Sequence, residues 1–302
     1  MKKIVLSLAI LLINCCAIAQ GCSDAGFCSV GSFKNTAAGS NDKSNTSLTL
    51  GSAFGVGEHA VFVTTPYIQL DKNFKKDWQL QAKITYNNVS KYGYAVSGFG
   101  DGYLIGIKSW NNKHQGKNAV NFGIKFPLNN ADNKSNGTSL PLAYQTTLET
   151  TDLIVGYTTQ SKTWSFAAAA QIPLIQNNTN SFISPTTDHL KSFVSTRQLN
   201  RKADVLLRAT KKFDANKSLV FRASGLIIYH LGNDSYTDLA NNTIEIKESG
   251  GVTFNINGGL NYRINDKLSL DILVGIPLVV RTVRPDGLTR SFVIVPELKW
   301  NF

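Results

Sequence analysis

The four histidines are the first residues to examine for chemistry, because an imidazole can hold a metal ion or move a proton. His59, His114, His189 and His230 are scattered along the chain and lack the short spacing of metal ligands. None of them stands in a motif that pairs a nucleophile with a base. We therefore expect no enzymatic activity, no bound metal and no cofactor.

A second group of charged residues shares one kind of position: each is the polar member of a segment in which apolar and polar residues alternate. If these segments are strands of a membrane barrel, their apolar side chains face lipid and the other parity faces the lumen. Basic residues outnumber acidic ones at these positions. We expect a polar, net basic lumen lined by Lys83, Lys108, Lys125, Arg208, Arg222, His230, Arg263, Arg281 and Lys299, together with Asp152, Asp204, Asp271 and Glu297.

Two interpretations of such a lumen are open. In a narrow barrel the interior polar side chains fill the space and pair with one another, and then they serve stability. The alternative is a pore that prefers anions, or a site for a carboxylate or a phenolate.

The elements that must position these residues are strands. From residue 48 onward the chain repeats one unit, an alternating segment followed by a turn, and Trp78, Leu80, Ala82, Ile84 and Tyr86 form its clearest apolar series. Alternation of this kind puts successive side chains on opposite faces of a strand. The pattern predicts an all-β fold with about twelve strands, near residues 47–55, 60–71, 77–88, 99–111, 117–128, 147–159, 162–175, 201–213, 217–231, 250–265, 267–281 and 290–302.

The connections between these segments differ in length. Those after every second strand are short, whereas those around residues 129–146, 176–200 and 232–249 are long and rich in Asn, Ser and Thr. Short turns at one end and long loops at the other are typical of outer-membrane barrels. The alternative is a secreted β-sandwich, but its strands usually have only five or six residues.

The tryptophans give an independent indication of how the strands are oriented. Trp78 and Trp164 begin strands that run toward the long loops, and Trp110 and Trp300 end strands that return. All four are therefore expected at one rim of the barrel, where aromatic girdles lie, although strict alternation points Trp110 inward.

The first residues read as an export signal, with Lys2 and Lys3 before an apolar run and with Ala17 and Ala19 in a cleavage site. We expect residues 1–19 to be removed, residues 20–46 to form an N-terminal segment and residues 47–302 to form the barrel. Cys22 is less well placed for lipidation than for a disulfide bond.

In an oxidising compartment, Cys22 and Cys28 are expected to form a small disulfide loop, with two free thiols as the alternative. The segment around them shows no strand pattern. One interpretation of the segment is a disordered periplasmic leader.

The last segment alternates to its final residue, with Phe292, Ile294, Leu298, Trp300 and Phe302 on one face. A closed barrel needs its last strand to pair with its first, because an unpaired edge in lipid leaves backbone groups without partners. The pair Trp300 and Phe302 also resembles the signal by which the outer-membrane assembly machinery recognises its clients.

Three prolines occupy similar places, in Phe-Pro-Leu at Pro127 and in Ile-Pro-Leu at Pro173 and Pro277. Proline cannot donate to a strand ladder, so we expect these positions to interrupt pairing near the long-loop end. An interruption could open a lateral exit for an apolar solute, or the strands could simply have left the membrane there.

The formal net charge is +11. A basic chain can bind nucleic acid, but this chain has no run of Lys or Arg and carries an export signal, so we expect no nucleic-acid partner.

Between residues 98 and 174, the stretches GFGDGYLIGIK, NFGIKFPLN, LETTDLIVGYTT and TWSFAAAAQIPL follow one another. This order resembles the outer-membrane proteins of the meta pathway of phenol degradation, which belong to the FadL-like transporters. The resemblance implies a channel in the outer membrane of a Gram-negative bacterium for passive passage of small hydrophobic or aromatic molecules. In that group the N-terminal region plugs the barrel, so the resemblance implies a small plug formed by residues 20–46, as the alternative to a disordered leader.

The partners expected for such a chain are outer-membrane lipid, the barrel assembly machinery and a small hydrophobic solute. The alternative function is a structural or adhesive barrel that acts through its extracellular loops and has a closed lumen.

Overall fold

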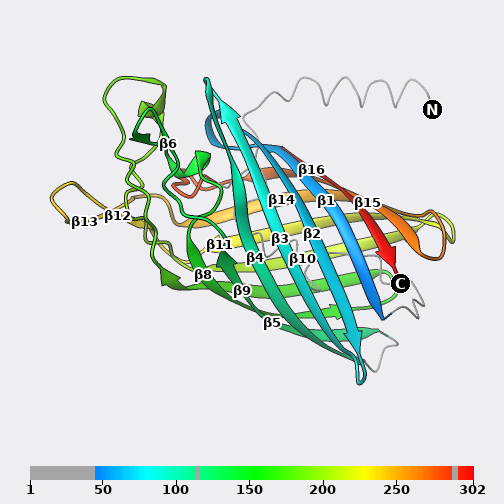
Figure 1. The fold of residues 1–302 in the computed structure, drawn as a ribbon. Coiled ribbons are helices and arrows are strands. Elements are labelled where there is room, and N and C mark those ends of the chain that lie inside the picture. Colours follow the sequence, from blue (N-terminus) through cyan, green and yellow to red (C-terminus); the bar gives the residue numbers. More distant parts are fainter. Residues whose placement is uncertain (1–44, 113–115, 288–291) are drawn as a thin grey trace, which may run out of the picture.

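Twelve antiparallel strands form a closed barrel in a computed structural model that describes residues 45–112, 116–287 and 292–302 (Figure 1). The predicted signal peptide, the Cys22–Cys28 pair and nearly all of the segment 20–46 lie outside the described residues. The barrel strands are β1 (Thr46–Val56), β2 (Phe62–Phe74), β3 (Trp78–Lys91), β4 (Tyr94–Asn111), β5 (Lys117–Pro127), β8 (Thr150–Gln160), β9 (Trp164–Gln176), β10 (Asp204–Asp214), β11 (Leu219–His230), β14 (Gly251–Arg263), β15 (Leu268–Val279) and β16 (Phe292–Asn301).

The remaining described elements are short and lie in the loops. Two small hairpins pair β6 (Lys134–Ser135) with β7 (Thr138–Ser139) and β12 (Ser235–Thr237) with β13 (Thr243–Glu245). Three 3-10 helices cover Glu58–Ala60, Leu142–Tyr144 and His189–Ser192. No helix in the described ranges is long and apolar enough to cross a membrane.

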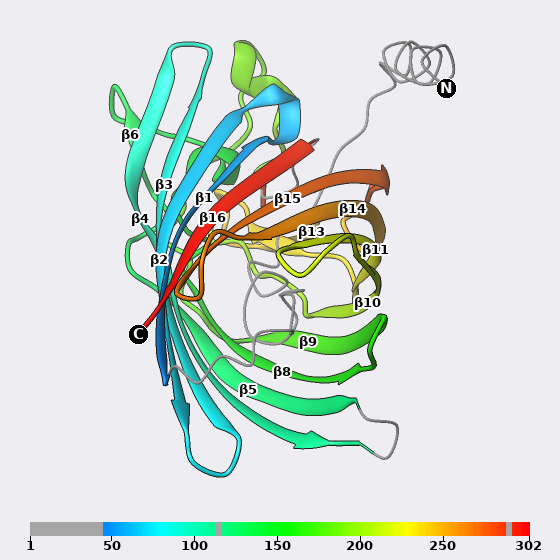
Figure 2. The same cartoon turned by 90° about the vertical axis from the view of Figure 1, so that its right-hand side faces the viewer.

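Each barrel strand pairs with the barrel strands that come before and after it in the sequence, and the last one, β16, pairs with the first, β1. The predicted all-β fold with twelve strands is therefore confirmed. We call the end with the short connections the turn end and the opposite end the loop end; Figure 2 shows the barrel from the turn end. By the usual orientation of such barrels, the turn end faces the periplasm.

The outer face of the barrel is apolar. Side chains such as Ile68, Phe122 and Leu207 are accessible from outside, with exposed fractions of 57%, 63% and 52%. Their strand neighbours of the opposite parity, such as Gln69, Asn121 and Arg208, point inward and are buried. The period-two alternation thus produces a surface suited to hydrocarbon.

Strand β4 departs from strict alternation, so the predicted orientations of Lys108 and Trp110 are both wrong. A bulge between β3 and β4 shifts the register, so that Lys83 pairs with Tyr103 and Trp78 pairs with Lys108. Trp78 faces outward, and the Lys108 ammonium lies 5.6 Å from the centre of its ring. The prediction that Lys108 lines the lumen is therefore wrong.

Trp110, two residues beyond Lys108, also faces outward rather than inward and contacts the ring of Tyr157. Strict alternation failed in β4 because the bulge reverses which parity faces the lumen: Phe99 points outward, whereas Tyr103, four residues later, is buried inside. All four tryptophans thus face outward at the turn end.

The backbone pairing between β1 and β16, which we call the seam, is interrupted near Pro296, and the side chain of Tyr67 reaches across β1 at this place. Gly51 pairs with Glu297 and Phe54 with Ile294, but no pairs lie between them, where Pro296 has no N–H to donate. Gly51 also pairs with Tyr67 of β2. The Tyr67 hydroxyl donates a hydrogen bond to Glu297 across β1, and only a glycine at position 51 leaves room for the ring.

We expect Gly51→Ala to destabilise the barrel, because a Cβ there would lie 2.5 Å from Cζ of Tyr67. Overpacking of this kind costs about 1–3 kcal/mol. Urea unfolding of the purified protein in liposomes, followed by tryptophan fluorescence, measures the change.

The matched control is Gly258→Ala on β14, where an added Cβ meets no atom within 4 Å. Equal unfolding free energies for the two variants would contradict a role of Gly51 in closing the seam.

Candidate functional site: the lumen and its covered mouth

The inner wall of the barrel is apolar on one side. Ten inward-facing residues from β4, β5, β8, β9, β10 and β11 form a continuous buried cluster, which we call the apolar wall: Tyr103, Ile105, Ile107, Ala119, Ile154, Ala167, Ala169, Leu206, Leu226 and Ile228. The alternation in the sequence does not predict this wall, because it assigns the apolar parity of β4 to lipid. The signal in the sequence was the presence of apolar residues at both parities, as in Leu206 and Leu207 or Leu226 and Ile227.

The opposite side of the inner wall is polar. Strands β1, β2, β3, β14, β15 and β16 contribute buried hydroxyl, amide and charged side chains: Ser47, Thr49, Gln69, Asp71, Gln81, Lys83, Thr85, Asn255, Asn257, Asp271 and Glu297. Within this polar wall, amides hold the carboxylate of Asp71: Gln81 donates to it at 2.7 Å and Gln69 at 3.0 Å. The lumen thus has a polar wall on one side and, on the other, an apolar cluster interspersed with inward-facing polar residues such as Asn121, Arg208 and Thr210.

Most of the residues predicted to line the lumen do lie on the inner face. Buried inward positions are taken by Lys83, Lys125, Asp152, Asp204, Arg208, Arg222, His230, Asp271 and Glu297. Arg263 and Lys299 occupy inward positions near the turn end and are half-buried. Arg281 is buried but follows β15 in a loop.

Two inward-facing cations, Arg222 and Lys83, make specific contacts with other side chains of the inner wall. The Arg222 guanidinium contacts both carboxylate oxygens of Asp271, at 2.6 and 2.7 Å, and lies across Gly259 of the intervening strand β14. Lys83 places its ammonium 4.0 Å from the ring centre of Tyr67 and 5.8 Å from that of Tyr103. Lys83 therefore touches the polar wall and the apolar wall at their boundary.

A first buried ion cluster lies at the loop end. The Lys125 ammonium of β5 is 3.1 Å from the carboxylate of Asp152 on β8 and 3.9 Å from that of Asp101 on β4. Thr147, which lies in the loop before β8, donates to Asp101 at 2.6 Å. This cluster thus attaches a loop to the inner wall.

A second ion cluster surrounds His230, and we call it the mouth cluster: Arg201, Asp204, His230, Asp234, Arg281 and Asp286. His230 Nδ1 lies 2.7 Å from Asp204, and Nε2 lies 2.7 Å from Asp234. All six residues are at most 4% exposed. Sequence analysis did not propose Asp101, Arg201, Asp234 or Asp286, because they lie at a bulge or in loops where alternation carries no information.

Four long loops fold inward over the loop end. They connect β5 to β8 (128–149), β9 to β10 (177–203), β11 to β14 (231–250) and β15 to β16, of which residues 280–287 are described. A small apolar core joins all four, with Leu148, Leu199 and Ile246 buried and Val283 packed against them. Figure 1 shows these loops gathered at that end of the barrel.

Two of these loops meet from opposite sides of the ring. A Cβ at Gly287 would lie 2.3 Å from Cα of Ala143, so the β15–β16 and β5–β8 loops touch. Six strand positions separate these loops around the twelve-stranded ring. Tyr144, next to Ala143, is fully buried, and burial raises the pKa of its phenol to about 12. The outer mouth is therefore covered in this structure.

The three prolines lie where pairing ends on one side. Pro127, Pro173 and Pro277 each pair with one neighbouring strand, whereas the last pairs on their other side are made by Lys125, Gln171 and Gly275.

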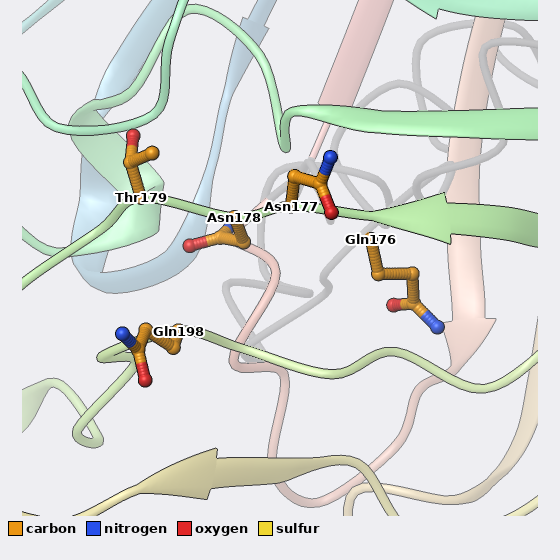
Figure 3. Close-up of a pocket in the computed structure, with 5 residues that line it drawn as sticks. All are labelled: Gln176, Asn177, Asn178, Thr179 and Gln198. Atoms are coloured by element: carbon orange, nitrogen blue, oxygen red, sulfur yellow. The ribbon is translucent and has the colours of Figure 1, made fainter.

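Beyond Pro173, the Gln176 side chain replaces the ladder, with its amide bonded to the backbone of Arg201 at 2.9 and 2.6 Å. A shallow polar pocket of about 520 Å³ lies at this place, lined by Gln176, Asn177, Asn178, Thr179 and Gln198 (Figure 3). A lateral exit at the prolines stays a prediction.

Comparison with known proteins supports the fold. No known family and no curated protein matches the chain by sequence. Among solved structures, an outer-membrane channel from Pseudomonas putida F1 superposes with a TM-score of 0.63 and 10% identity, over 88% of this chain and 100% of that one. The NanC porin superposes with a TM-score of 0.50 and 9% identity, over 84% and 100%. The chain therefore has the fold of these outer-membrane barrels, and its outer face is apolar, as in barrels that span a membrane.

We expect Arg222→Met to lower the free energy of unfolding by roughly 3 kcal/mol, because it leaves the buried Asp271 carboxylate without its cation. Urea unfolding in liposomes measures the loss. The double variant Arg222→Met with Asp271→Leu should recover much of it, and a double variant no more stable than the single one would argue against this pairing.

The gap beyond Pro173 can be measured by cross-linking. If the β9–β10 ladder continued, position 173 would face position 202, as position 169 faces position 206. We expect Ala169→Cys with Leu206→Cys to form a disulfide readily, and Pro173→Cys with Lys202→Cys to form little. Equal yields on a non-reducing gel would mean that the wall is closed there and would remove the hypothesis of a lateral exit at Pro173.

Proposed function

We propose that this barrel is a channel for passive passage of small hydrophobic or aromatic molecules across the outer membrane. The observation that carries the proposal is the apolar wall inside the lumen. Ordinary barrel lumens are polar, whereas Ile154, Leu206 and Leu226 are apolar residues that face inward and are fully buried. A chain that needed only to fill its interior with paired polar groups would have no use for this wall.

The two halves of the lumen have complementary tasks in this mechanism. The apolar wall is covered in this structure, and in an open form contact with it would stabilise an apolar solute by about 25 cal/mol per Å² of surface removed from water. The polar wall keeps water and hydroxyl groups beside it, so that binding stays weak enough for release. Capture, weak binding and release then follow the concentration gradient without energy input.

The cations near the apolar wall favour solutes with one acidic group. Arg208 pairs across strands with Ala167 and Leu226, two members of that wall. Lys83 lies beside the ring of Tyr103, a third member. A guanidinium or ammonium beside an apolar surface suits a carboxylate or phenolate on a small apolar body. The resemblance to the meta-pathway proteins implies small hydrophobic or aromatic compounds, which agrees with the apolar body of such a solute but not specifically with its acidic group.

A second candidate function is a structural or adhesive barrel with a closed lumen. The covered mouth favours it, because inward-folded loops oppose passage. Solute uptake by liposomes separates the two functions, since a permanently closed barrel passes no solute.

We expect Leu206→Asn to slow uptake of a small aromatic acid into liposomes about tenfold, because one buried leucine contributes on the order of 1.5–3 kcal/mol to apolar contact. Uptake of a small sugar should change much less. The measurement is the ratio of the two initial rates.

The control is Asn257→Thr, a substitution on the polar wall at an equally buried inward position. It should leave the ratio unchanged. A wild-type barrel that passes neither solute at neutral or at alkaline pH would rule out the channel. An equal fall of both rates in Leu206→Asn would rule out the apolar wall as its selective surface.

A further inference from the structure

We propose that the mouth cluster is a latch that holds the outer loops over the lumen, and that His230 is the residue whose charge keeps it shut. This inference rests on the proposed channel function and concerns its regulation. In this proposal the covered mouth is the closed state of a channel that can also open.

The first argument is the hydrogen bonding of His230. Its two ring nitrogens each lie 2.7 Å from a carboxylate oxygen, Nδ1 from Asp204 and Nε2 from Asp234. An ionised carboxylate only accepts hydrogen bonds, and a neutral imidazole has a single N–H. Both contacts can therefore be hydrogen bonds only when the ring carries two protons. Loss of one proton places a nitrogen lone pair against a buried carboxylate.

The second argument is charge balance among the groups that face His230. Arg201 contacts Asp204 and lies 3.6 Å from Asp286. Arg281 lies 2.8 Å from Asp286 and 3.9 Å from Asp234. Among these contacts, the mouth cluster joins three carboxylates to two guanidinium groups, and Arg201 also attracts Asp101 and Asp152 of the first ion cluster. His230 adds a positive charge between Asp204 and Asp234 only in its protonated form. Unbalanced charge at this burial is costly.

The mouth cluster connects strands of the barrel wall to the outer loops. Asp204 and His230 belong to the wall strands β10 and β11, whereas Arg201, Asp234, Arg281 and Asp286 belong to three different loops. The Arg281 guanidinium also donates to the Ser249 carbonyl at 2.7 Å, near the far end of the β11–β14 loop. A single buried cluster therefore fixes the three loops to the wall.

Asn200 and Ser235 are placed so that a disulfide between cysteines at these positions would hold the loop closed; we call this disulfide the lock. Asn200 and Ser235 form an isolated antiparallel bridge with backbone hydrogen bonds of 2.7 and 3.0 Å. Residues paired in this way have Cα atoms about 5.5 Å apart, which is within the range of a disulfide. Asn200→Cys with Ser235→Cys would hold the β11–β14 loop against the segment before β10.

The first experiment measures conductance in planar lipid bilayers. Wild type should be mostly closed at neutral pH and should open as the pH rises and the imidazolium loses a proton. His230→Gln should be open at neutral pH, with an open-to-closed ratio about tenfold higher, and should not respond to alkaline pH. The matched control is His189→Gln, an exposed histidine in the β9–β10 loop that stacks on Tyr92 outside the mouth cluster.

The second experiment uses the lock. Oxidised Asn200→Cys with Ser235→Cys should stay closed at alkaline pH and should open there after reduction, whereas the same reductant should not change wild type. Folding of every variant is verified by the mobility of the unheated barrel on SDS gels.

The outcomes separate this inference from the channel itself. If wild type and all variants never conduct, the proposed channel fails. If wild type conducts equally at both pH values, if His189→Gln opens as much as His230→Gln, or if the oxidised lock opens normally, the latch is refuted and the channel stands.

Discussion

The constraint on which the structure depends is that hydrocarbon offers no hydrogen-bond partner to the backbone. Twelve strands satisfy one another's N–H and C=O groups only because β16 returns to β1 and closes the ring. Pro296 weakens the ladder at that seam. The prolines at positions 127, 173 and 277 are tolerated because they lie at the loop end, where pairing stops on one side.

Inside the ring, long side chains reach over a glycine to the second strand beyond their own. Tyr67 crosses Gly51 to reach Glu297, and Arg222 crosses Gly259 to reach Asp271. Each contact ties three strands together without adding a backbone bond. A Cβ at Gly51 would lie 2.5 Å from Cζ of Tyr67, and one at Gly259 would lie 3.0 Å from the Arg222 guanidinium, so the crossing side chain would have to shift in either case. The polar wall therefore serves stability through specific pairs, in keeping with one of the two interpretations of a charged lumen.

Pairs of this kind do not account for the apolar wall. Apart from Tyr103, its side chains are aliphatic and cannot form hydrogen bonds, and they do not face lipid, so polar pairing does not explain why they are there. The apolar wall and the mouth cluster lie on the same strands, with Asp204 two residues from Leu206 and His230 two residues from Ile228. A loop rearrangement at the mouth cluster would thus uncover the lumen directly above the apolar wall. Under the proposed function, the contact surface and its cover share one part of the barrel.

The strand number, the approximate strand ends, the lipid-facing parity of most strands and the aromatic rim could all be predicted from the sequence alone. These follow from local alternation, which has a period of two and needs no partner. Only the tertiary structure decided the face of β4, because one bulged residue reverses the parity of Lys108 and Trp110 and sends Tyr103 inward. It also decided which charges meet: His230 and Asp204 are 26 residues apart, and Arg201 and Asp286 come from different loops. Cross-strand register and loop paths set such contacts, and neither is encoded in a local pattern.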